Sequence, residues 1–203
     1  MKKIPTLSER KFINHEVVGV SPTVAPGMEW VLEGKGVATV KIDGSCCAII
    51  DGKFYKRYDA KNRKKVPAGS IPCCEPDPVT GHWPHWAPVD RDNPSDKWFV
   101  KALNNYAVAC TYVVNGHKTY YIPEGTYEAV GPHFQGNPYE LGYDTLSLHG
   151  KHEVDVERTF EGIRKWLEEN AEEGLVFWLD GEPRCKIKRR DFGFDWPIKG
   201  EKA

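Results

Sequence analysis

The sequence lacks any long apolar run. No window of its 203 residues approaches the roughly 18 consecutive apolar residues that a membrane-spanning helix needs. The first residues, MKKIPTLSERKF, lack the apolar core of a secretory signal peptide. We therefore expect a cytosolic protein with no membrane partner. With 40% hydrophobic residues the chain can bury a sizeable core, but it is short for two independent domains, so we expect one domain over residues 1–203.

The sequence also lacks the cysteine spacing of a disulfide or zinc framework. Six cysteines in a chain of this size and expected compartment are typical of thiols. Two adjacent pairs, at residues 46–47 and 73–74, precede His82 and His85. Neighbours on a strand point to opposite faces, however, and neither pair has C-x-x-C spacing. The cysteine pairs therefore do not favour a zinc site.

A strong net charge is missing as well. The formal charge is −1, whereas non-specific nucleic-acid binders are often strongly basic. The basic residues are nonetheless clustered, and a solvated face is the simplest interpretation of such clusters. One cluster comprises Lys56, Arg57, Lys61, Arg63, Lys64 and Lys65, and a second comprises Lys186, Lys188, Arg189 and Arg190.

Three hairpins are predicted from the pattern that is present. Residues 37–59 alternate like strands, and Asp51-Gly52 is a strong hairpin turn because both turn positions need positive φ. That register sets Arg57 opposite Cys46. Asn115-Gly116 repeats the device between TYVV and HKTYY, and EGLVFWL turns through DGEP into RCKIKRR. We therefore expect mostly antiparallel sheet.

Two further segments complete the expected α+β fold. Residues 72–94 are dense in Pro, Trp, His and Asp, which predicts a long ordered loop. A helix is expected from about residue 156 to residue 170, behind Asp155 as a suitable N-cap. The apolar residues that recur there at helical spacing are Val156, Phe160, Ile163, Trp166 and Leu167.

Lys41 is unexpected in the stretch VKIDGSCCAIIDGKFYKRYDAK, which otherwise predicts a buried hairpin. A lysine on a strand can simply extend its amine to water. The functional alternative is a nucleophile, because a deprotonated amine attacks phosphorus, and nearby cations or desolvation lower the pKa of a lysine enough for that. A nucleophilic Lys41 therefore requires other lysines close by.

The third hairpin supplies such lysines. Lys186 and Lys188 are two residues apart and share one strand face, and the predicted turn brings Glu173, Leu175 and Phe177 to the same side. Two like charges side by side indicate an anion held between them, for which a nucleotide phosphate is the natural candidate. The alternative is an exposed basic edge strand that resists aggregation.

The order of KIDG, Arg57, YEAVG, EGLVF and KIK resembles that of the covalent nucleotidyltransferases, which are ATP-dependent ligases and mRNA capping guanylyltransferases. Longer stretches resemble the small ATP-dependent RNA ligase family that includes the vertebrate 5′-to-3′ RNA ligase; these are KIDGSCC, GHWPHWAPV, GNPYELG, LHG, EGLVFW and KRRDFGFDWPI. The resemblance runs from about Lys41 to Ile198. It implies an α+β nucleotidyltransferase domain with antiparallel sheets around a nucleotide cleft.

The resemblance also implies a role for each matching residue. Lys41 would become AMP-lysine, with Asp43 and Gly44 completing its motif, and Glu173 would help to hold Mg²⁺, for which Mn²⁺ can substitute. His149, in LHG, receives no role and is expected to be structural. The other implied ATP contacts are Arg57 to phosphate, Glu128 to the ribose although tyrosine precedes it where the superfamily has glycine, Val176 beneath adenine, and Lys186 and Lys188 to the α-phosphate.

The implied activity is an ATP-dependent RNA ligase that joins 5′-phosphate and 3′-hydroxyl RNA ends through lysyl-AMP and adenylylated RNA, in RNA repair. The basic residues expected to grip RNA are Lys56, Lys61, Arg63, Lys64 and Lys65. A DNA ligase or a GTP-using capping enzyme is the first alternative, although these relatives append an OB-fold domain and few residues follow KIKRRDFG here. A catalytically silent RNA-binding module is the second, although binding alone needs no nucleophile.

Overall fold

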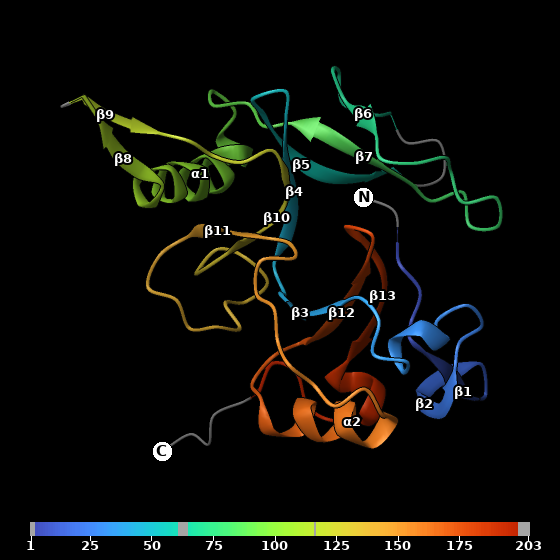
Figure 1. The fold of residues 1–203 in the computed structure, drawn as a ribbon. Helices are drawn as coiled ribbons and strands as arrows, with labels where there is room; N and C mark the ends of the chain where they lie inside the picture. Colours follow the sequence, from blue (N-terminus) through green and yellow to red (C-terminus); the bar gives the residue numbers. More distant parts are fainter. Residues whose placement is uncertain (1–2, 61–64, 116, 199–203) are drawn as a thin grey trace, which may run out of the picture. The chain divides into compact units, whose positions relative to one another are not determined.

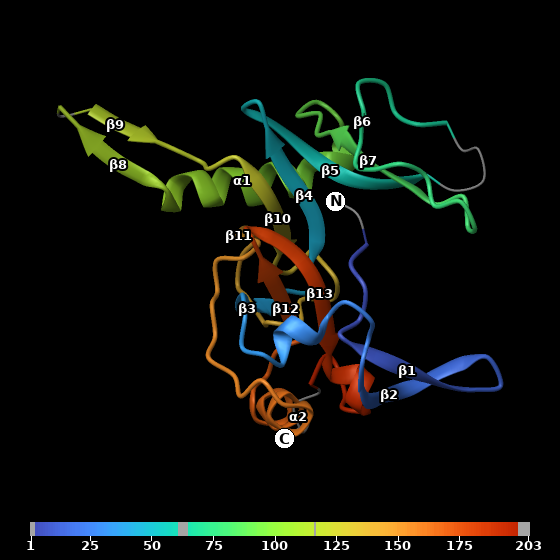
Figure 2. The same ribbon diagram turned by 45° about the vertical axis from the view of Figure 1, so that its right-hand side comes forward.

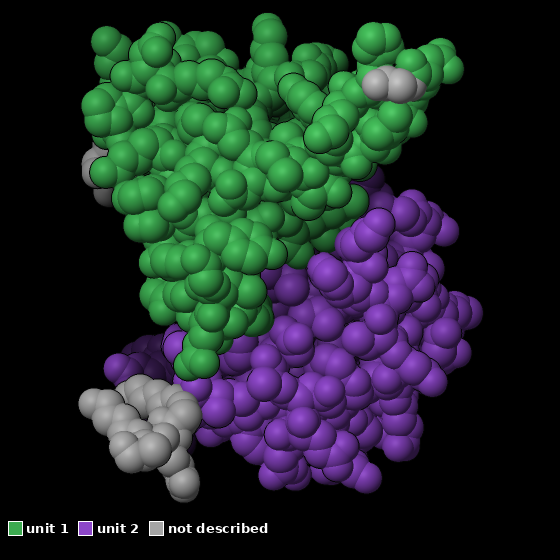
Figure 3. Space-filling model, turned by 90° about the vertical axis from the view of Figure 1, so that its left-hand side faces the viewer, with its two compact units in different colours: residues 1–2, 43–149 green, residues 3–42, 150–203 purple. Residues whose placement is uncertain are grey.

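The computed structural model describes residues 3–60, 65–115 and 117–198. These residues form two compact units, coloured separately in Figure 3. Unit 1 comprises residues 43–149, and unit 2 comprises residues 3–42 and 150 onward. Whether the two units act as one domain stays a prediction. In the described part of the chain, no helix is long and apolar enough to cross a membrane.

Unit 1 is built on a six-stranded antiparallel sheet with the strand order β11-β10-β4-β5-β7-β6 (Figure 1). The helix α1 (Lys97–Ala109) packs against β10 and β11 through a core that contains Tyr127, Phe134 and Leu146. A short 3-10 turn, η2 (Pro94–Asp96), precedes this helix. The strands are β4 (Ser45–Ile50), β5 (Lys53–Ala60), β6 (Ile71–Pro72), β7 (Trp83–Pro88), β10 (Gly125–Val130) and β11 (Thr145–Leu148).

The first predicted hairpin is confirmed in β4 and β5. Asp51 and Gly52 have φ values of 50° and 68°, and they join the pair formed by Ile50 and Lys53. The ladder ends where Cys47 lies opposite Lys56, which is the register that was predicted to set Arg57 opposite Cys46, and the charge of Arg57 acts on the Cys46 thiol.

The second predicted hairpin is also present, as β8 (Thr111–Val114) and β9 (His117–Tyr120). Val114 pairs with His117, and Asn115 has a φ of 50°, while Gly116 lies outside the described residues. The two strands form a separate two-stranded ribbon beyond the end of α1, seen in Figures 1 and 2. All eight strand residues are exposed.

Two elements of unit 1 depart from the sequence prediction. The segment expected to be a loop contains β7, which pairs with β5 and β6, and α1 was not predicted at all. The carbonyl of Pro84 accepts a hydrogen bond from Cys73 N, on the side of the short β6. In an antiparallel strand the nitrogen and the carbonyl of a residue point to the same side, so the missing N–H of Pro84 costs no hydrogen bond to the long β5. Proline is tolerated at such a position, and the prolines therefore do not exclude a strand.

Unit 2 contains a three-stranded antiparallel sheet with the order β13-β12-β3 (Figure 2). Its core joins Leu175, Phe177 and Ile187 of the sheet to Ile163 and Leu167 of the helix α2, so α2 covers one sheet face. The elements of unit 2 are the hairpin β1 (Ser8–Ile13) and β2 (Glu16–Val24), η1 (Glu29–Val31), β3 (Val37–Lys41), α2 (Phe160–Glu169), β12 (Gly174–Leu179), β13 (Glu182–Lys188) and η3 (Arg189–Phe192).

The third predicted hairpin exists, but its predicted register is wrong by one residue. The turn is the two-residue Asp180-Gly181, not the four residues DGEP, and a bulge follows between Phe177 and Trp178 in the pairing with β13. Lys186 therefore lies opposite Val176, and Lys188 lies opposite Gly174. As a result Leu175 and Phe177 occupy the buried face, opposite to the face on which they were expected.

The predicted helix is confirmed in type but begins later than expected. Its N-cap is Thr159, whose hydroxyl accepts a hydrogen bond of 2.9 Å from Gly162 N, and not Asp155. Val156 is not helical, yet it joins the same buried core. Together the two units form a mainly antiparallel α+β fold, as predicted, whereas the nucleotidyltransferase assignment stays a prediction.

Candidate active site

Lys41 is the last residue of β3, and β3 pairs with β12, which is distant in the sequence. It therefore does not belong to the hairpin of β4 and β5 that follows it. Lys41 lies opposite Gly174 on one side, and Lys188 lies opposite the same glycine on the other. A Cβ atom on Gly174 would stand 2.3 Å from the carbonyl oxygen of Ile187, so only glycine allows this close approach of the strands.

Glu173 connects the two lysines. Its Oε2 lies 2.5 Å from Nζ of Lys41, and its Oε1 lies 2.5 Å from Nζ of Lys188. The carboxylate is almost fully buried, with 6% of the side chain exposed, whereas 20% of the Lys41 side chain and 35% of the Lys188 side chain are exposed. One buried carboxylate therefore holds two partly exposed ammonium groups. Glu173 and Lys188 thus contact each other, as expected from the prediction that they lie on the same side of the hairpin.

Four of the predicted site residues of unit 2 occupy one face of the sheet. Lys41, Val176 and both predicted phosphate-binding lysines, Lys186 and Lys188, lie at positions of equal parity along paired strands. The opposite face carries Leu175 and Ile187 and is buried against α2. The sheet therefore separates a charged face from an apolar core.

The pKa of Lys186, on this charged face, is shifted. Burial lowers the pKa of Lys186 to about 8, and the neighbouring charges of Lys188 and Lys41 act in the same direction, while Glu173 opposes them. Desolvation and like charges both disfavour an ammonium group. This is the electrostatic setting in which an anion binds well, because the anion relieves the repulsion between the lysines.

The two arginines after Lys188 serve the fold instead of this face. The buried guanidinium of Arg189 donates hydrogen bonds to the carbonyls of Leu167 and Asn170, at the end of α2, and to that of Asp195. Arg190 donates to the carbonyl of Trp196. The sequence cluster of four cations is thus divided between a charged face and a helix C-terminus.

In unit 1, the residues after Lys41 are held by two contacts. The backbone N–H of Asp43 donates a 2.7 Å hydrogen bond to the hydroxyl of Tyr139. A Cβ atom on Gly44 would stand 2.5 Å from the carbonyl oxygen of Ala129, so glycine is required there. Tyr139 lies in the GNPYELG stretch, but no pattern in the sequence links it to Asp43.

Glu128 and Arg57 both adjoin Cys46 on one face of the six-stranded sheet. Glu128 pairs directly with Cys46 across β10 and β4, and Arg57 lies on the other side of Cys46, on β5. The Nε of Arg57 donates a 2.9 Å hydrogen bond to Asp59. Burial alone would raise the pKa of Asp59, but Arg57 and His82 together lower it below its usual value.

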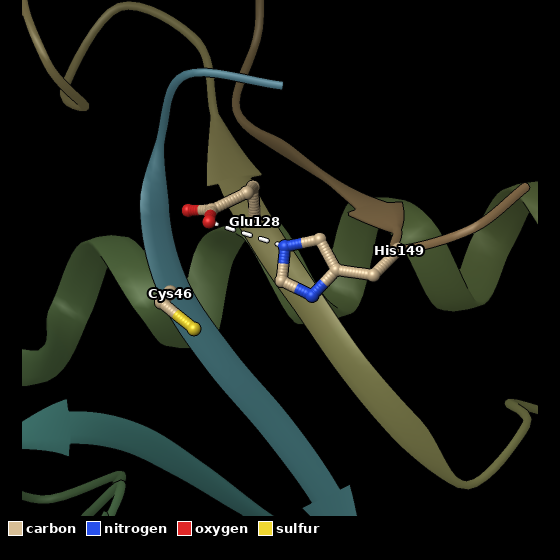
Figure 4. A group of neighbouring side chains, drawn as sticks. All are labelled: Cys46, Glu128 and His149. Atoms are coloured by element: carbon tan, nitrogen blue, oxygen red, sulfur yellow. Dashed lines mark hydrogen bonds and ion pairs between the residues drawn. The ribbon is translucent and has the colours of Figure 1, made fainter. Parts of the chain in front are cut away.

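His149, which sequence reasoning left without a role, contacts Glu128. Its Nε2 lies 3.1 Å from Oε1 of Glu128, as Figure 4 shows. Its Nδ1 lies 2.8 Å from the hydroxyl of Thr126. Since a carboxylate only accepts, Nε2 carries the hydrogen and the hydroxyl donates to Nδ1. Burial and the charge of Glu128 raise the pKa of the Cys46 thiol to about 12, so Cys46 has little character of a free nucleophile.

The predicted RNA-binding cluster is only partly visible. Lys56 forms an ion pair with Asp96, which is 1% exposed, so its ammonium group already has a structural partner. Lys65 is exposed. Lys61, Arg63 and Lys64 lie outside the described residues, and their contact with RNA stays a prediction.

Comparison with known proteins identifies the family. The family model described as RNA ligase 1 matches residues 64–202, which is more than half of the chain. The chain belongs to the RNA ligase 1 family. RNA ligase 1 of Danio rerio is 30% identical over 140 residues, covering 58% of this chain and 43% of that protein. RNA ligase 1 of Pongo abelii is 25% identical over 228 residues, covering 80% of this chain and 69% of that protein.

Membership of the RNA ligase 1 family confirms the resemblance inferred from the sequence. The chain spans less than half of the Danio rerio relative, so the activity of a whole RNA ligase 1 protein is not carried over by the match. The family model covers Glu128 and the charged face around Glu173, but it begins after Lys41 and Arg57. The roles of the individual residues therefore stay predictions.

Proposed function

We propose that this chain is an ATP- and Mg²⁺-dependent RNA ligase that joins a 5′-phosphate RNA end to a 3′-hydroxyl RNA end through an AMP-lysine on Lys41. We further propose that it is a covalent nucleotidyltransferase, that its nucleotide lies in a cleft, and that it repairs RNA in the cytosol. The observation that carries the proposal is the shared carboxylate of Glu173, which holds Lys41 and Lys188 on one accessible sheet face.

The sheet gives Lys41 the rigidity that a covalent nucleophile needs. A nucleophile must stay in line with the phosphorus it attacks, and a residue at the end of a paired strand moves less than a residue on a loop. Because Lys41 and Lys188 both lie opposite Gly174, the nucleophile and a phosphate-binding cation have a fixed spacing.

In the first step, Nζ of Lys41 attacks the α-phosphorus of ATP. The bond from that phosphorus to the bridging oxygen breaks, and pyrophosphate leaves with the electron pair, while the proton of Nζ passes to solvent. An ammonium group has no free electron pair, so Lys41 must first leave its ion pair with Glu173 and lose one proton to solvent. Lys186 and Lys188 stabilise the charge that develops on the α-phosphate.

Glu173 is the residue that would hold the divalent cation. A buried carboxylate suits Mg²⁺, which binds through one or two carboxylates, keeps several waters and takes substrate phosphate oxygens as further ligands. Both oxygens of Glu173 already bind cationic groups, so the site accepts positive charge. The bound cation would neutralise the charge of the triphosphate.

The later steps transfer AMP and seal the strand. An oxygen of the RNA 5′-phosphate attacks the phosphorus of the AMP-lysine, the P–N bond breaks, and Lys41 regains its electron pair and a proton. The 3′-hydroxyl of the second end then attacks the 5′-phosphate, and AMP leaves. Lys188 and Lys186 can support both transfers, because each proceeds through charge on phosphate oxygens.

Covalent labelling tests the first step. The protein is incubated with Mg²⁺ and each α-labelled NTP, and acid-stable label on the protein is measured. Label from ATP alone supports the proposal, whereas label from GTP and a GMP-capped product from 5′-diphosphate RNA would identify a capping enzyme. Absence of label with every NTP would leave the RNA-binding module as the better interpretation.

The substrate is tested separately with pre-adenylylated protein. All-RNA, all-DNA and mixed strands with matched sequences are supplied, with a ribose or deoxyribose 3′ end. Sealing that requires RNA and declines as salt rises supports the proposal, because ribose hydroxyls distinguish RNA while phosphate contacts are screened by salt. Equal sealing of every combination would contradict the assignment to RNA.

A further inference from the structure

A second group of reactive side chains lies on unit 1, and of its three members only Glu128 has an implied contact with ATP. The thiol of Cys46, the carboxylate of Glu128 and the imidazole of His149 each offer one ligand atom, and these atoms all lie within 4.8 Å of one another. Figure 4 shows them converging from three neighbouring segments of the sheet. Cys46 and His149 are partly exposed, so an ion can reach the group.

The strand register explains why the three side chains meet. Cys46 on β4 lies directly opposite Glu128 on β10. On the other side of β10, His149 N donates to the carbonyl of Thr126, which continues the pairing of β11 by one residue. Thr126 and Glu128 are two residues apart and share a face, so His149 arrives on the face of Cys46 and Glu128.

Glu128 has an unmet need for a positive partner. Its Oε1 contacts His149, whereas no donor among the described residues reaches its Oε2, which is buried from solvent. Glu128 as a whole is only 9% exposed. A buried carboxylate oxygen without a partner is costly, and a bound cation would satisfy it.

We propose that Cys46, Glu128 and His149 form a site for Zn²⁺ with one coordination position open. Sulfur, imidazole nitrogen and carboxylate oxygen are the ligands that Zn²⁺ takes in proteins, and three such ligands with an open fourth position are typical of accessible zinc sites. Mg²⁺ prefers an all-oxygen shell, so this site is distinct in chemistry from Glu173. The ligands of a tetrahedral zinc ion lie roughly 3.3–3.6 Å apart, so small side-chain rotations from the observed spacing are enough.

Thr126 completes the site as an orienting partner. Zinc-bound histidine usually donates its second ring N–H to a neighbouring oxygen, and the Thr126 hydroxyl lies 2.8 Å from Nδ1 of His149. A hydroxyl can donate or accept, so it supports the tautomer that frees Nε2 for the metal. Metal binding would release the thiol proton of Cys46 to solvent, and the proton of His149 would move from Nε2 to Nδ1, where the Thr126 hydroxyl can accept a hydrogen bond from it.

This site differs from the zinc site that the sequence argued against. The adjacent pairs at 46–47 and 73–74 would need both members of a pair to point at one ion, whereas this group takes a single cysteine and gains its other ligands from β10 and the end of β11. The competing explanation is a hydrogen-bonded cluster in which the sulfur plays no part. A measurement that reports on metal–sulfur bonding therefore separates the two.

Cobalt substitution tests the site directly. Chelator-treated protein is titrated with Co²⁺, and the near-ultraviolet charge-transfer absorption from thiolate to Co²⁺ is measured, followed by displacement with Zn²⁺ against a chromophoric chelator. The proposal predicts one equivalent of metal and an absorption band that Cys46→Ser abolishes and Cys74→Ser retains. Absence of the band in the wild-type protein, or its persistence in Cys46→Ser, would overturn the proposal.

Two further variants guard against a misfolded Cys46→Ser protein. His149→Gln should weaken Zn²⁺ binding by at least about tenfold, and Thr126→Val by roughly ten- to a hundredfold, the range known for loss of an orienting partner. Near-ultraviolet circular dichroism of each apo variant confirms the fold. Unchanged Zn²⁺ affinity in both folded variants would also overturn the proposal.

One consequence rests on the proposed function. If Glu128 contacts the ribose of ATP, Zn²⁺ at this site should inhibit labelling of Lys41 at constant Mg²⁺, and higher ATP should relieve the inhibition. Cys46→Ser should label normally and resist Zn²⁺. Metal binding is measured without ATP, so failure of labelling altogether would remove the ligase proposal and leave the zinc result intact. Labelling that is equally sensitive to Zn²⁺ in both proteins would place the inhibition at another site.

Discussion

The two sheets each bury a glutamate, but the two carboxylates have opposite surroundings. Glu173 in unit 2 has an ammonium group on each oxygen, from Lys41 and Lys188. Glu128 in unit 1 has one oxygen on His149, and its other oxygen has no donor among the described residues. The difference teaches that burial alone does not define a carboxylate site. The neighbouring side chains decide the proposed ligand. Beside two lysines, Glu173 suits Mg²⁺ and a nucleotide phosphate, whereas beside a thiol and an imidazole, Glu128 suits Zn²⁺ or a ribose hydroxyl.

Replacing the nucleophile should give the largest effect. Lys41→Arg keeps the positive charge beside Glu173, but a guanidinium stays protonated and cannot attack phosphorus. We expect AMP labelling to be abolished while the fold is kept, as measured by acid-stable label and circular dichroism. Lys165→Arg, an exposed change on α2, is the control. Full labelling of Lys41→Arg would mean that another residue carries AMP.

Neutralising the paired carboxylate should have the next largest effect. Glu173→Gln leaves Lys41 and Lys188 without their shared counter-charge and removes the expected metal ligand. Labelling should slow by roughly a hundred- to a thousandfold, the scale of a lost electrostatic catalytic group. Excess Mg²⁺ or Mn²⁺ should restore part of the rate. Glu168→Gln on α2 serves as the matched control, and an equal loss in that variant would contradict the role of Glu173.

Changing pH should have a smaller effect that is confined to the unit 2 face. Because the pKa of Lys186 is about 8, its ammonium form is lost as pH rises through that value. Lys186→Arg stays charged. The ratio of wild-type to Lys186→Arg labelling at low ATP should therefore fall by up to about fivefold from pH 8 to pH 9. The ratio cancels the ionisation of Lys41, and a ratio independent of pH would show that Lys186 does not bind the α-phosphate.

Neutralising the other carboxylate should have the smallest effect on labelling. Glu128→Gln removes at most one hydrogen bond to the ribose, so KM for ATP should rise about two- to tenfold with little change in kcat. The same variant should lose Zn²⁺ binding. If Glu128→Gln and Glu173→Gln reduce labelling equally, the contrast between the two carboxylates is wrong.

Local turn chemistry explains which parts of the fold were predictable. Asp51-Gly52 and Asp180-Gly181 both adopt positive φ, and each ends one strand and begins the next, as dipeptides of this kind do. The register of β12 and β13 was predicted one residue out, because a bulge that no local pattern announces follows the second turn. The strand β7 was not predicted because its prolines argued against a strand. A single sequence does not show that Pro84 directs its nitrogen toward the short β6, where a missing N–H is tolerated.

The candidate sites, like the fold, were predictable only in part. Family resemblance grouped Lys41, Glu173 and Lys188, but only the pairing of β3 with β12 shows that one carboxylate serves both lysines. Cys46 and His149 escaped prediction as a pair, because their meeting depends on the register of β4 and β11 on either side of β10. Long-range register is a tertiary property, and a single sequence does not display it.

Lys186 also links the charged face to the stability of the protein. Its pKa is about 8 in the folded chain and 10.5 for an ordinary lysine, so between these values the unfolded chain binds more protons than the folded chain. The contribution of Lys186 to the free energy of unfolding therefore rises as pH increases from about 8 to 10.5, because the cost of burying its charge disappears. Nucleotide binding should weaken over the same interval. The residue that assists the proposed reaction thus opposes folding at neutral pH, a trade expected where a charge is kept partly desolvated for a substrate.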